Sequence, residues 1–206
     1  MTRIFIGFIV CFLFLNCNKK EEIIHLNNKF YIVSYEDKKF KKYADSLKEN
    51  SDKVTFPSIK GFYCQNQLLI DSKGNLFFYQ KEYIPRICGS ADRIDTIPYL
   101  LNLQPIDLIQ TPQSNVNDFL SLNILSKKKN EQRLIIASQN DTIKNKSIFS
   151  FTSKLKAYKI RRTTQEEDTV LKYKKNNESY NYEDIKWNQN RITLPFIKPK
   201  LKNQNE

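Results

Sequence analysis

Residues 61–84 read GFYCQNQLLIDSKGNLFFYQKEYI, and this stretch predicts a β-hairpin. Two apolar and aromatic runs, over 61–71 and 75–84, flank the polar loop Asp-Ser-Lys-Gly-Asn. Gly74 can supply the positive φ that such a loop requires. Pro85 ends the second run, because proline cannot donate to a strand ladder. The stretch therefore predicts an antiparallel pair of strands.

Elements on both sides of the hairpin are predicted from apolar periodicity. A short buried strand is expected at 30–34 and a helix at 35–50, where Ser34 and Asp37 resemble a capping box. Downstream we expect short helical turns over 95–110 and a helix over 115–127 capped by Ser114. A strand over 133–138, a turn at Asn140 and Asp141, a helix over 146–156 and a strand over 158–162 are expected next. A helix with a capping box of Thr164 and Glu167 follows, and one or two edge strands are expected before Pro195. Helices and strands mix without a strict βαβ period, which predicts a single α+β domain with an antiparallel sheet and several short helices.

The N-terminus has the pattern of a secretory signal. A positive start at Arg3 precedes an apolar run from Ile4 to Leu15, and Cys17 stands at the junction with a polar stretch. The run is shorter than the roughly 17–25 residues that a membrane-spanning helix needs. A cysteine stands where a small-residue cleavage site is otherwise expected.

This arrangement resembles a bacterial lipoprotein signal peptide. Phe14 and Asn16 differ from the usual motif and resemble the relaxed motif of Bacteroidetes lipoproteins. The resemblance implies that Cys17 is acylated, that it becomes the new N-terminus, and that the protein is anchored in the cell envelope, with the outer membrane as the expected site. Lys20-Glu21-Glu22 resembles a surface-export signal, which leaves the periplasmic and the surface face open. An uncleaved hydrophobic anchor and a buried N-terminal strand are the alternatives.

The resulting organisation has four parts. We expect a signal peptide at 1–16, a lipidated cysteine and tether at 17–29, an α+β domain at 30–197 and a disordered tail at 198–206. The formal charge of the chain is +12, and its lysines are spread along the sequence. We therefore expect no nucleic-acid partner, and we expect the basic surface to meet anionic lipid head groups or an acidic protein.

Cysteine usage follows from the signal. Cys11 leaves with the signal peptide and Cys17 takes the lipid, so Cys64 and Cys88 remain in an exported domain, where disulfides persist. A bridge between them would close a loop of about 25 residues and stabilise the fold by roughly 3–3.5 kcal/mol. Two separate buried thiols are the alternative.

Several catalytic chemistries are not supported. The chain has one histidine, His25 in the tether, so neither the usual nucleophilic triads nor a histidine zinc site can be assembled. Four glycines are too few and too scattered for a phosphate-binding loop. We expect no cofactor and no metal. Carboxylates that could pair for glycoside hydrolysis are Asp71, Glu82, Asp92, Asp95, Glu166, Glu167 and Asp168.

Two groups of residues are candidates for binding. Arg161 and Arg162 could present a guanidinium fork to an anion, or they end a strand that runs into a capped helix. Tyr180, Tyr182 and Trp187 could form an interface, or they pack on the core. The sequence therefore predicts a lipid-anchored, non-enzymatic binding or protective module of immunity type, with a carboxylate-dependent hydrolase and a structural envelope component as alternatives.

Overall fold

The structure is a computed structural model of the chain, and it describes residues 30–49, 64–82, 99–187, 190–191 and 195–201. The strands are β1 (Tyr31–Ile32), β2 (Asn66–Ile70), β3 (Leu76–Lys81), β4 (Tyr99–Leu100), β5 (Ile109–Thr111), β6 (Arg133–Ser138), β7 (Thr142–Ile143), β8 (Ala157–Arg162), β9 (Asn190–Arg191) and β10 (Phe196–Ile197). The helices are α3 (Val33–Glu49), α5 (Val116–Leu120), α6 (Lys146–Thr152) and α7 (Gln165–Asn176), with a π turn at Ser121–Leu125 and 3-10 turns at Pro105–Asp107, Gln113–Asn115 and Tyr182–Asp184.

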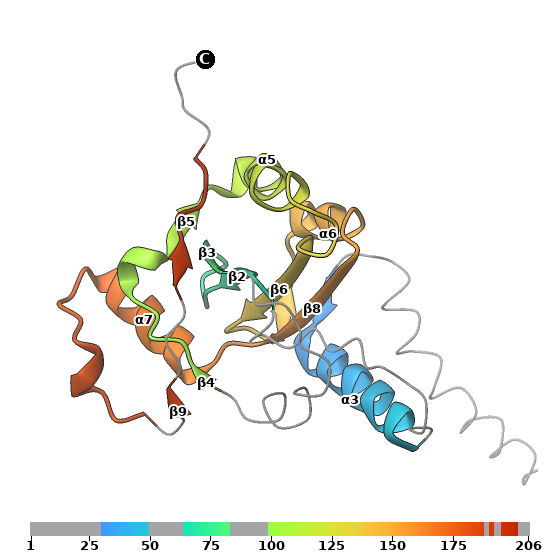
Figure 1. Ribbon diagram of the computed structural model, residues 1–206, viewed down its shortest axis with the longest axis horizontal. Helices are drawn as coiled ribbons and strands as arrows, with labels where there is room; N and C mark the ends of the chain where they lie inside the picture. Colours follow the sequence, from blue (N-terminus) through green and yellow to red (C-terminus); the bar gives the residue numbers. More distant parts are fainter. Residues whose placement is uncertain (1–29, 50–63, 83–98, 188–189, 192–194, 202–206) are drawn as a thin grey trace, which may run out of the picture.

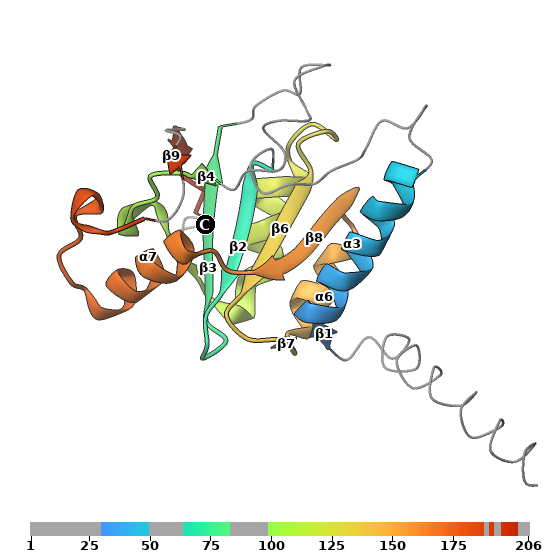
Figure 2. The ribbon, with the colours of Figure 1, turned by 90° about the horizontal axis from the view of Figure 1, so that it is seen from below.

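A mixed sheet in the order β10-β3-β2-β6-β8 forms the centre of the fold, and β5 also pairs with β3 (Figures 1 and 2). The predicted hairpin is confirmed as β2 and β3, which pair antiparallel from Asn66↔Gln80 to Ile70↔Leu76. Gly74 has a φ of 86°, which is the left-handed conformation expected of it in the loop.

The strands β2, β6 and β8 run parallel, which the sequence analysis did not anticipate. β6 pairs in parallel with β2 on one side and with β8 on the other, and α6 lies in the connection between β6 and β8. Such a central strand is buried on both faces, which explains the unbroken apolar run Leu134–Ala137. The α+β class is confirmed, with a sheet that is mixed rather than wholly antiparallel.

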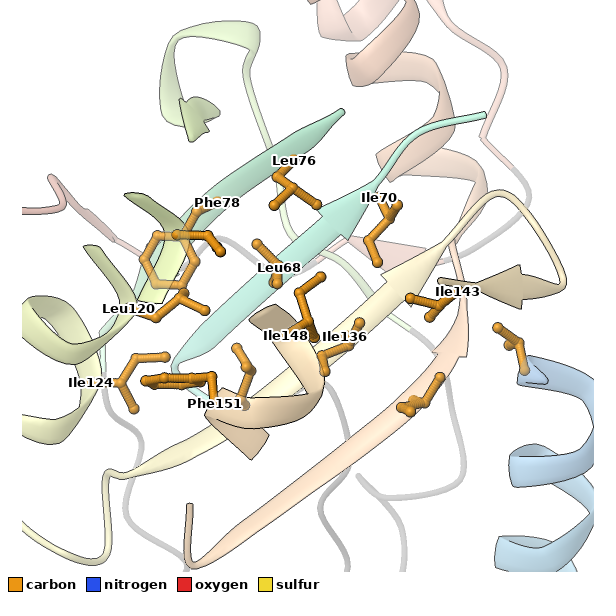
Figure 3. Close-up of a cluster of buried hydrophobic side chains, with 14 residues drawn as sticks. Leu68, Ile70, Leu76, Phe78, Leu120, Ile124, Ile136, Ile143, Ile148 and Phe151 are labelled. Atoms are coloured by element: carbon orange, nitrogen blue, oxygen red, sulfur yellow. The ribbon is translucent and has the colours of Figure 1, made fainter. Parts of the chain in front are cut away.

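Each face of the sheet carries its own hydrophobic core. The larger core contains Leu68, Phe78 and Ile136 from the sheet, together with residues of α5 and α6 (Figure 3). The second core joins Leu69 and Phe77 to residues of α7 and of the segment before β5. Figure 1 shows α5 and α6 on one side of the sheet and α7 on the other. The strand alternation distributes neighbouring residues between the two cores.

The helix α3 begins at Val33 and is not capped as predicted. Asp141, far along the chain, accepts hydrogen bonds from the backbone N–H and the hydroxyl of Ser34, both at 3.0 Å. The backbone N–H of Val33 donates to the Asp141 carbonyl at 2.8 Å. Ser34 is the second residue of α3 and not the residue before the helix, so it is not at the cap position that the expected capping box with Asp37 requires.

The later helices confirm some expectations and correct others. The capping box of Thr164 and Glu167 is present at the start of α7. The side chain of Ser114 caps no helix, and the expected helix is divided into a 3-10 turn, α5 and a π turn. α6 is capped by Asn145 and ends at Thr152, earlier than expected. The strands expected at 133–138 and 158–162 are confirmed as β6 and β8.

Of the segment expected to hold helical turns, 95–110, the structure describes residues 99–110, and these contain one such turn, at Pro105–Asp107, between β4 and β5. The tail that was expected to be disordered from Lys198 is described as far as Leu201. Lys200 is held there by Asn123, whose amide donates to the Lys200 carbonyl at 2.9 Å and accepts from its N–H at 2.7 Å.

Candidate ligand-binding groove

A groove opens at the edge of the sheet where the parallel strands β2 and β6 end. The β2–β3 turn and β7 lie at this same edge in Figure 2. The groove has a volume of about 790 Å³ and is lined by residues 72–74 of the turn on one side and by residues 140–147 on the other. Ligands of open sheets bind beyond the carboxyl ends of parallel strands, and ligand sites measure roughly 300–1,000 Å³. The groove therefore has the position and size of a ligand site.

The β2–β3 turn is held rigid by Asp71. Its carboxylate accepts hydrogen bonds from the N–H groups of Lys73 and Asn75, each at 2.8 Å, and pairs with Lys175 at 2.9 Å. Burial alone would raise the pKa of Asp71, but Lys175 and Asn75 together lower it below its ordinary value. The side chain of Gln113 donates to the carbonyl of Gly74 at 2.9 Å. The wall of the groove that carries Lys73 is thus fixed in place.

The loop after β6 is tied to this turn by amide side chains. Gln139 accepts from the N–H of Ser72 and donates to Asp168, both at 2.8 Å. Asn140 donates to the carbonyl of Ser72 at 2.8 Å. These bonds connect the two walls of the groove.

The far wall consists of β7 and the start of α6. Asn145 caps α6 by accepting from the N–H groups of Ser147 and Ile148, at 3.0 and 3.1 Å. The side chain of Ile143 is buried in the larger core, which anchors β7. Lys144 and Lys146 beside it are exposed.

The groove has an excess of positive charge. Lys73, Lys144 and Lys146 line it, and Asp141 is the only acid among the described residues that do so. Asp141 already accepts from Ser34 and lies 3.7 Å from Arg162. Three ammonium groups against one engaged carboxylate favour an anionic ligand.

Arg161 does not present a free fork to solvent. Both of its terminal nitrogens contact the carboxylate of Glu167 at 2.7 Å. Burial alone would raise the pKa of Glu167, but Arg161 lowers it below its ordinary value. Arg162 is half exposed and donates to the carbonyl of Gln139 at 2.6 Å. Arg161 and Arg162 are thus the end of a strand, β8, that runs into a capped helix, α7, which is the second of the two interpretations that their sequence allows.

The predicted aromatic group comes together beside α7. Tyr182 stacks on Trp187 with ring centroids 4.6 Å apart, and Tyr180 meets the edge of Tyr182. The Tyr182 hydroxyl donates to Glu166 at 3.1 Å, and Tyr182 is 5% exposed. These contacts favour the interpretation that Tyr182 packs on the core, and none of the three residues lines the groove.

Cys64 and Lys81 are buried at the open end of the β2–β3 hairpin, opposite its turn. Cys64 is a free thiol in the structure and donates to the carbonyl of Asn66 at 3.3 Å. Burial raises the pKa of Cys64 to about 11 and lowers that of Lys81 to about 8. Cys17 and Cys88 lie outside the described residues, so their lipidation and disulfide remain predictions.

The candidate carboxylates of the hydrolase alternative are largely engaged in structural bonds. Glu166 accepts from the N–H groups of Leu101 and Leu103, and burial raises its pKa. Glu167 pairs with Arg161, Asp71 with Lys175, and Asp168 accepts from Gln139. Glu82 is exposed, and the expected candidates Asp92 and Asp95 lie outside the described residues.

Comparison with protein-family models, with curated proteins and with solved structures finds no match for this chain. Over the described ranges, no group of three histidine, cysteine or acidic side chains comes close enough to hold a metal ion. None of the described helices has the length and apolar character to cross a membrane.

The groove lysines are not among the residues that the sequence predicts to bind a ligand. Lys73 is about 70 residues from Lys144 and Lys146 in the sequence, and all three are exposed, which makes them resemble any solvated lysines. Their position in the sequence is the signal that could have identified them, because each lies just after a predicted strand or after a predicted turn next to one. Only the parallel pairing of β2 and β6 brings those strand ends together.

Proposed function

We propose that this protein is a lipid-anchored component of a bacterial cell envelope that acts by binding a ligand rather than by catalysis. A protective module of immunity type, which captures a toxic protein at the membrane, is the concrete form of this proposal. Its ligand is acidic and occupies the groove beside β7.

The observation that carries the proposal is the basic groove itself. Its walls are fixed by Asp71 and Gln139, so the three lysines are presented by a rigid surface. A preorganised site loses less conformational freedom when a ligand binds. Because Asp141 is already engaged, the groove offers no pair of carboxylates for glycoside hydrolysis among its described residues.

The strand β1, into which the predicted tether leads, pairs with β7 at the groove. Thirteen residues separate Cys17 from Tyr31, and fully extended they span at most about 45 Å. Tyr31 pairs with Ile143, which lines the groove. A chain acylated at Cys17 therefore keeps the groove within reach of the membrane surface.

Metabolic labelling with a palmitate analogue tests the anchor. We expect the wild-type protein to be labelled and the Cys17→Ala variant to be unlabelled, with the Cys11→Ala variant as the matched control that keeps its label. An unlabelled wild-type protein would remove the anchor from the proposal.

Cross-linking in intact envelopes tests the binding role. A photoreactive residue at Lys144 is expected to capture an acidic partner, whereas one at Lys128, on an exposed loop away from the groove, is not. A deletion strain that gains sensitivity to a toxin would support the protective form. Equal capture from both positions would count against the groove as the binding site.

A further inference from the structure

The strand β7 lies along the groove with one edge paired and the other open. In an antiparallel pair, hydrogen-bonded residue pairs alternate with pairs that are not hydrogen-bonded. Val33 donates to the carbonyl of Asp141 at 2.8 Å, and two residues further on Tyr31 faces Ile143 in the same register. Thr142 stands between these pairs, so its own N–H and C=O point away from β1.

The open edge of β7 has no partner within the described parts of the chain. β1 and β7 form a sheet of two strands, and no described residue hydrogen-bonds to the main chain of Thr142. Thr142 and Lys144 are exposed and line the groove. An open strand edge is a template on which an extended peptide can add as a further strand.

The charges around this edge select the chemistry of such a peptide. Lys73 stands on the wall formed by the turn, and Lys144 and Lys146 follow β7 directly. Alternate side chains of an added strand point to the same face. Carboxylates at every second position would therefore face the lysines, while the main chain bonds to Thr142.

We propose that the ligand of the groove is an extended, acidic peptide segment of a partner protein, which adds to the open edge of β7 as a strand. This inference rests on the binding function proposed above and names the ligand class of the same groove. Main-chain hydrogen bonds supply the affinity, and the three lysines supply the selection for acidic side chains.

A labelled peptide of alternating glutamate and valine, titrated into the purified full-length chain in detergent, tests this inference. Two matched peptides of the same sequence, one N-methylated at every glutamate and one at every valine, each lack the N–H donors along one edge. We expect the peptide whose methylated edge faces β7 to bind about tenfold or more weakly, the loss expected for one or two hydrogen bonds, and the other to bind as the unmodified peptide does. A peptide of alternating lysine and valine should not bind.

Variants of the protein provide the matched controls. Thr142→Pro removes the outward N–H, which the β1–β7 ladder does not use, and should weaken binding about tenfold. Thr142→Val keeps that N–H and should bind as the wild type does. The triple variant Lys73→Gln, Lys144→Gln and Lys146→Gln should lose binding, while Lys128→Gln, Lys129→Gln and Lys172→Gln together should retain it.

The outcomes separate the two proposals. If the groove lysines are required but N-methylation and Thr142→Pro have no effect, strand addition is overturned and an acidic ligand in the groove stands. If the lysine variants have no effect either, both are overturned. Lysine-dependent binding to anionic vesicles without any peptide binding assigns the groove to lipid head groups and overturns strand addition.

Discussion

Arg161 and Glu167 form a largely buried bidentate ion pair, with both terminal nitrogens of Arg161 at 2.7 Å from the carboxylate. The pair joins the end of β8 to the first turn of α7. The hydroxyl of Tyr79 donates to the same carboxylate at 2.9 Å, which adds β3 to the connection. The backbone N–H of Thr164 donates to it as well, so the carboxylate has a full set of partners.

Removal of one member of this pair should destabilise the fold strongly. The change Glu167→Gln leaves the Arg161 charge buried without its partner, which costs about 3–5 kcal/mol. Chemical denaturation should therefore show a free energy of unfolding that is lower than that of the wild type by about 3–5 kcal/mol. Asp118→Asn, at an exposed position, serves as the control, and an equal loss in both variants would contradict this role for the pair.

The same pair predicts a pH dependence. The folded-state pKa of Glu167 lies below its ordinary value because of Arg161 and despite burial. Its stabilisation is therefore complete above the ordinary glutamate pKa of about 4.3, and is lost as the pH falls through the lower folded value. The free energies of unfolding of wild type and Glu167→Gln should converge as the pH falls from 6 to 3, and a constant difference between them would contradict the assignment.

Lys81 predicts a second rise of stability with pH, in the alkaline range. It is fully buried, and burial lowers its folded-state pKa to about 8. Between that value and the ordinary lysine pKa of about 10.4, the unfolded chain binds more protons, so stability rises with pH by up to about 3 kcal/mol. Lys81→Met should lack this rise when unfolding is measured from pH 7 to pH 10.5. The exposed Lys172→Met should keep it, and its presence in Lys81→Met would refute the explanation.

Local elements of this fold could be predicted from sequence, because short-range patterns determine them. Gly74 indicates the hairpin, and Thr164 with Glu167 indicates the start of α7. The parallel pairing of β2 with β6 could not be predicted, since its contacts join strands more than 60 residues apart. The cap of α3 was missed for the same reason, because Asp141 reaches Ser34 from a distant loop. The groove depends on both long-range features.

A side chain at Gly74 would have room, but it would put an L-residue into a strained backbone conformation. Its φ is 86°, and a Cβ added there would meet no atom within 4 Å. Gly74→Ala should therefore cost about 1–2 kcal/mol, the strain of a left-handed conformation in an L-residue, without disturbing the packing. Thermal unfolding measures the loss. Gly74→Asn should lose less, because asparagine tolerates this conformation best after glycine, and equal losses would contradict the conformational explanation.

Cys64 should be unreactive in the folded protein. The thiol is 2% exposed, and burial raises its pKa to about 11, so almost no thiolate is present at pH 8. Since the thiolate is the reactive species, iodoacetamide should leave Cys64 unmodified in the native chain and modify it after unfolding in guanidinium. Peptide mass analysis of protein made in a reducing cytosol measures both states, and rapid native labelling would contradict the burial. Protein recovered from the envelope tests the predicted disulfide in addition, because a Cys64–Cys88 bridge leaves no thiol at Cys64 to label after unfolding without reductant.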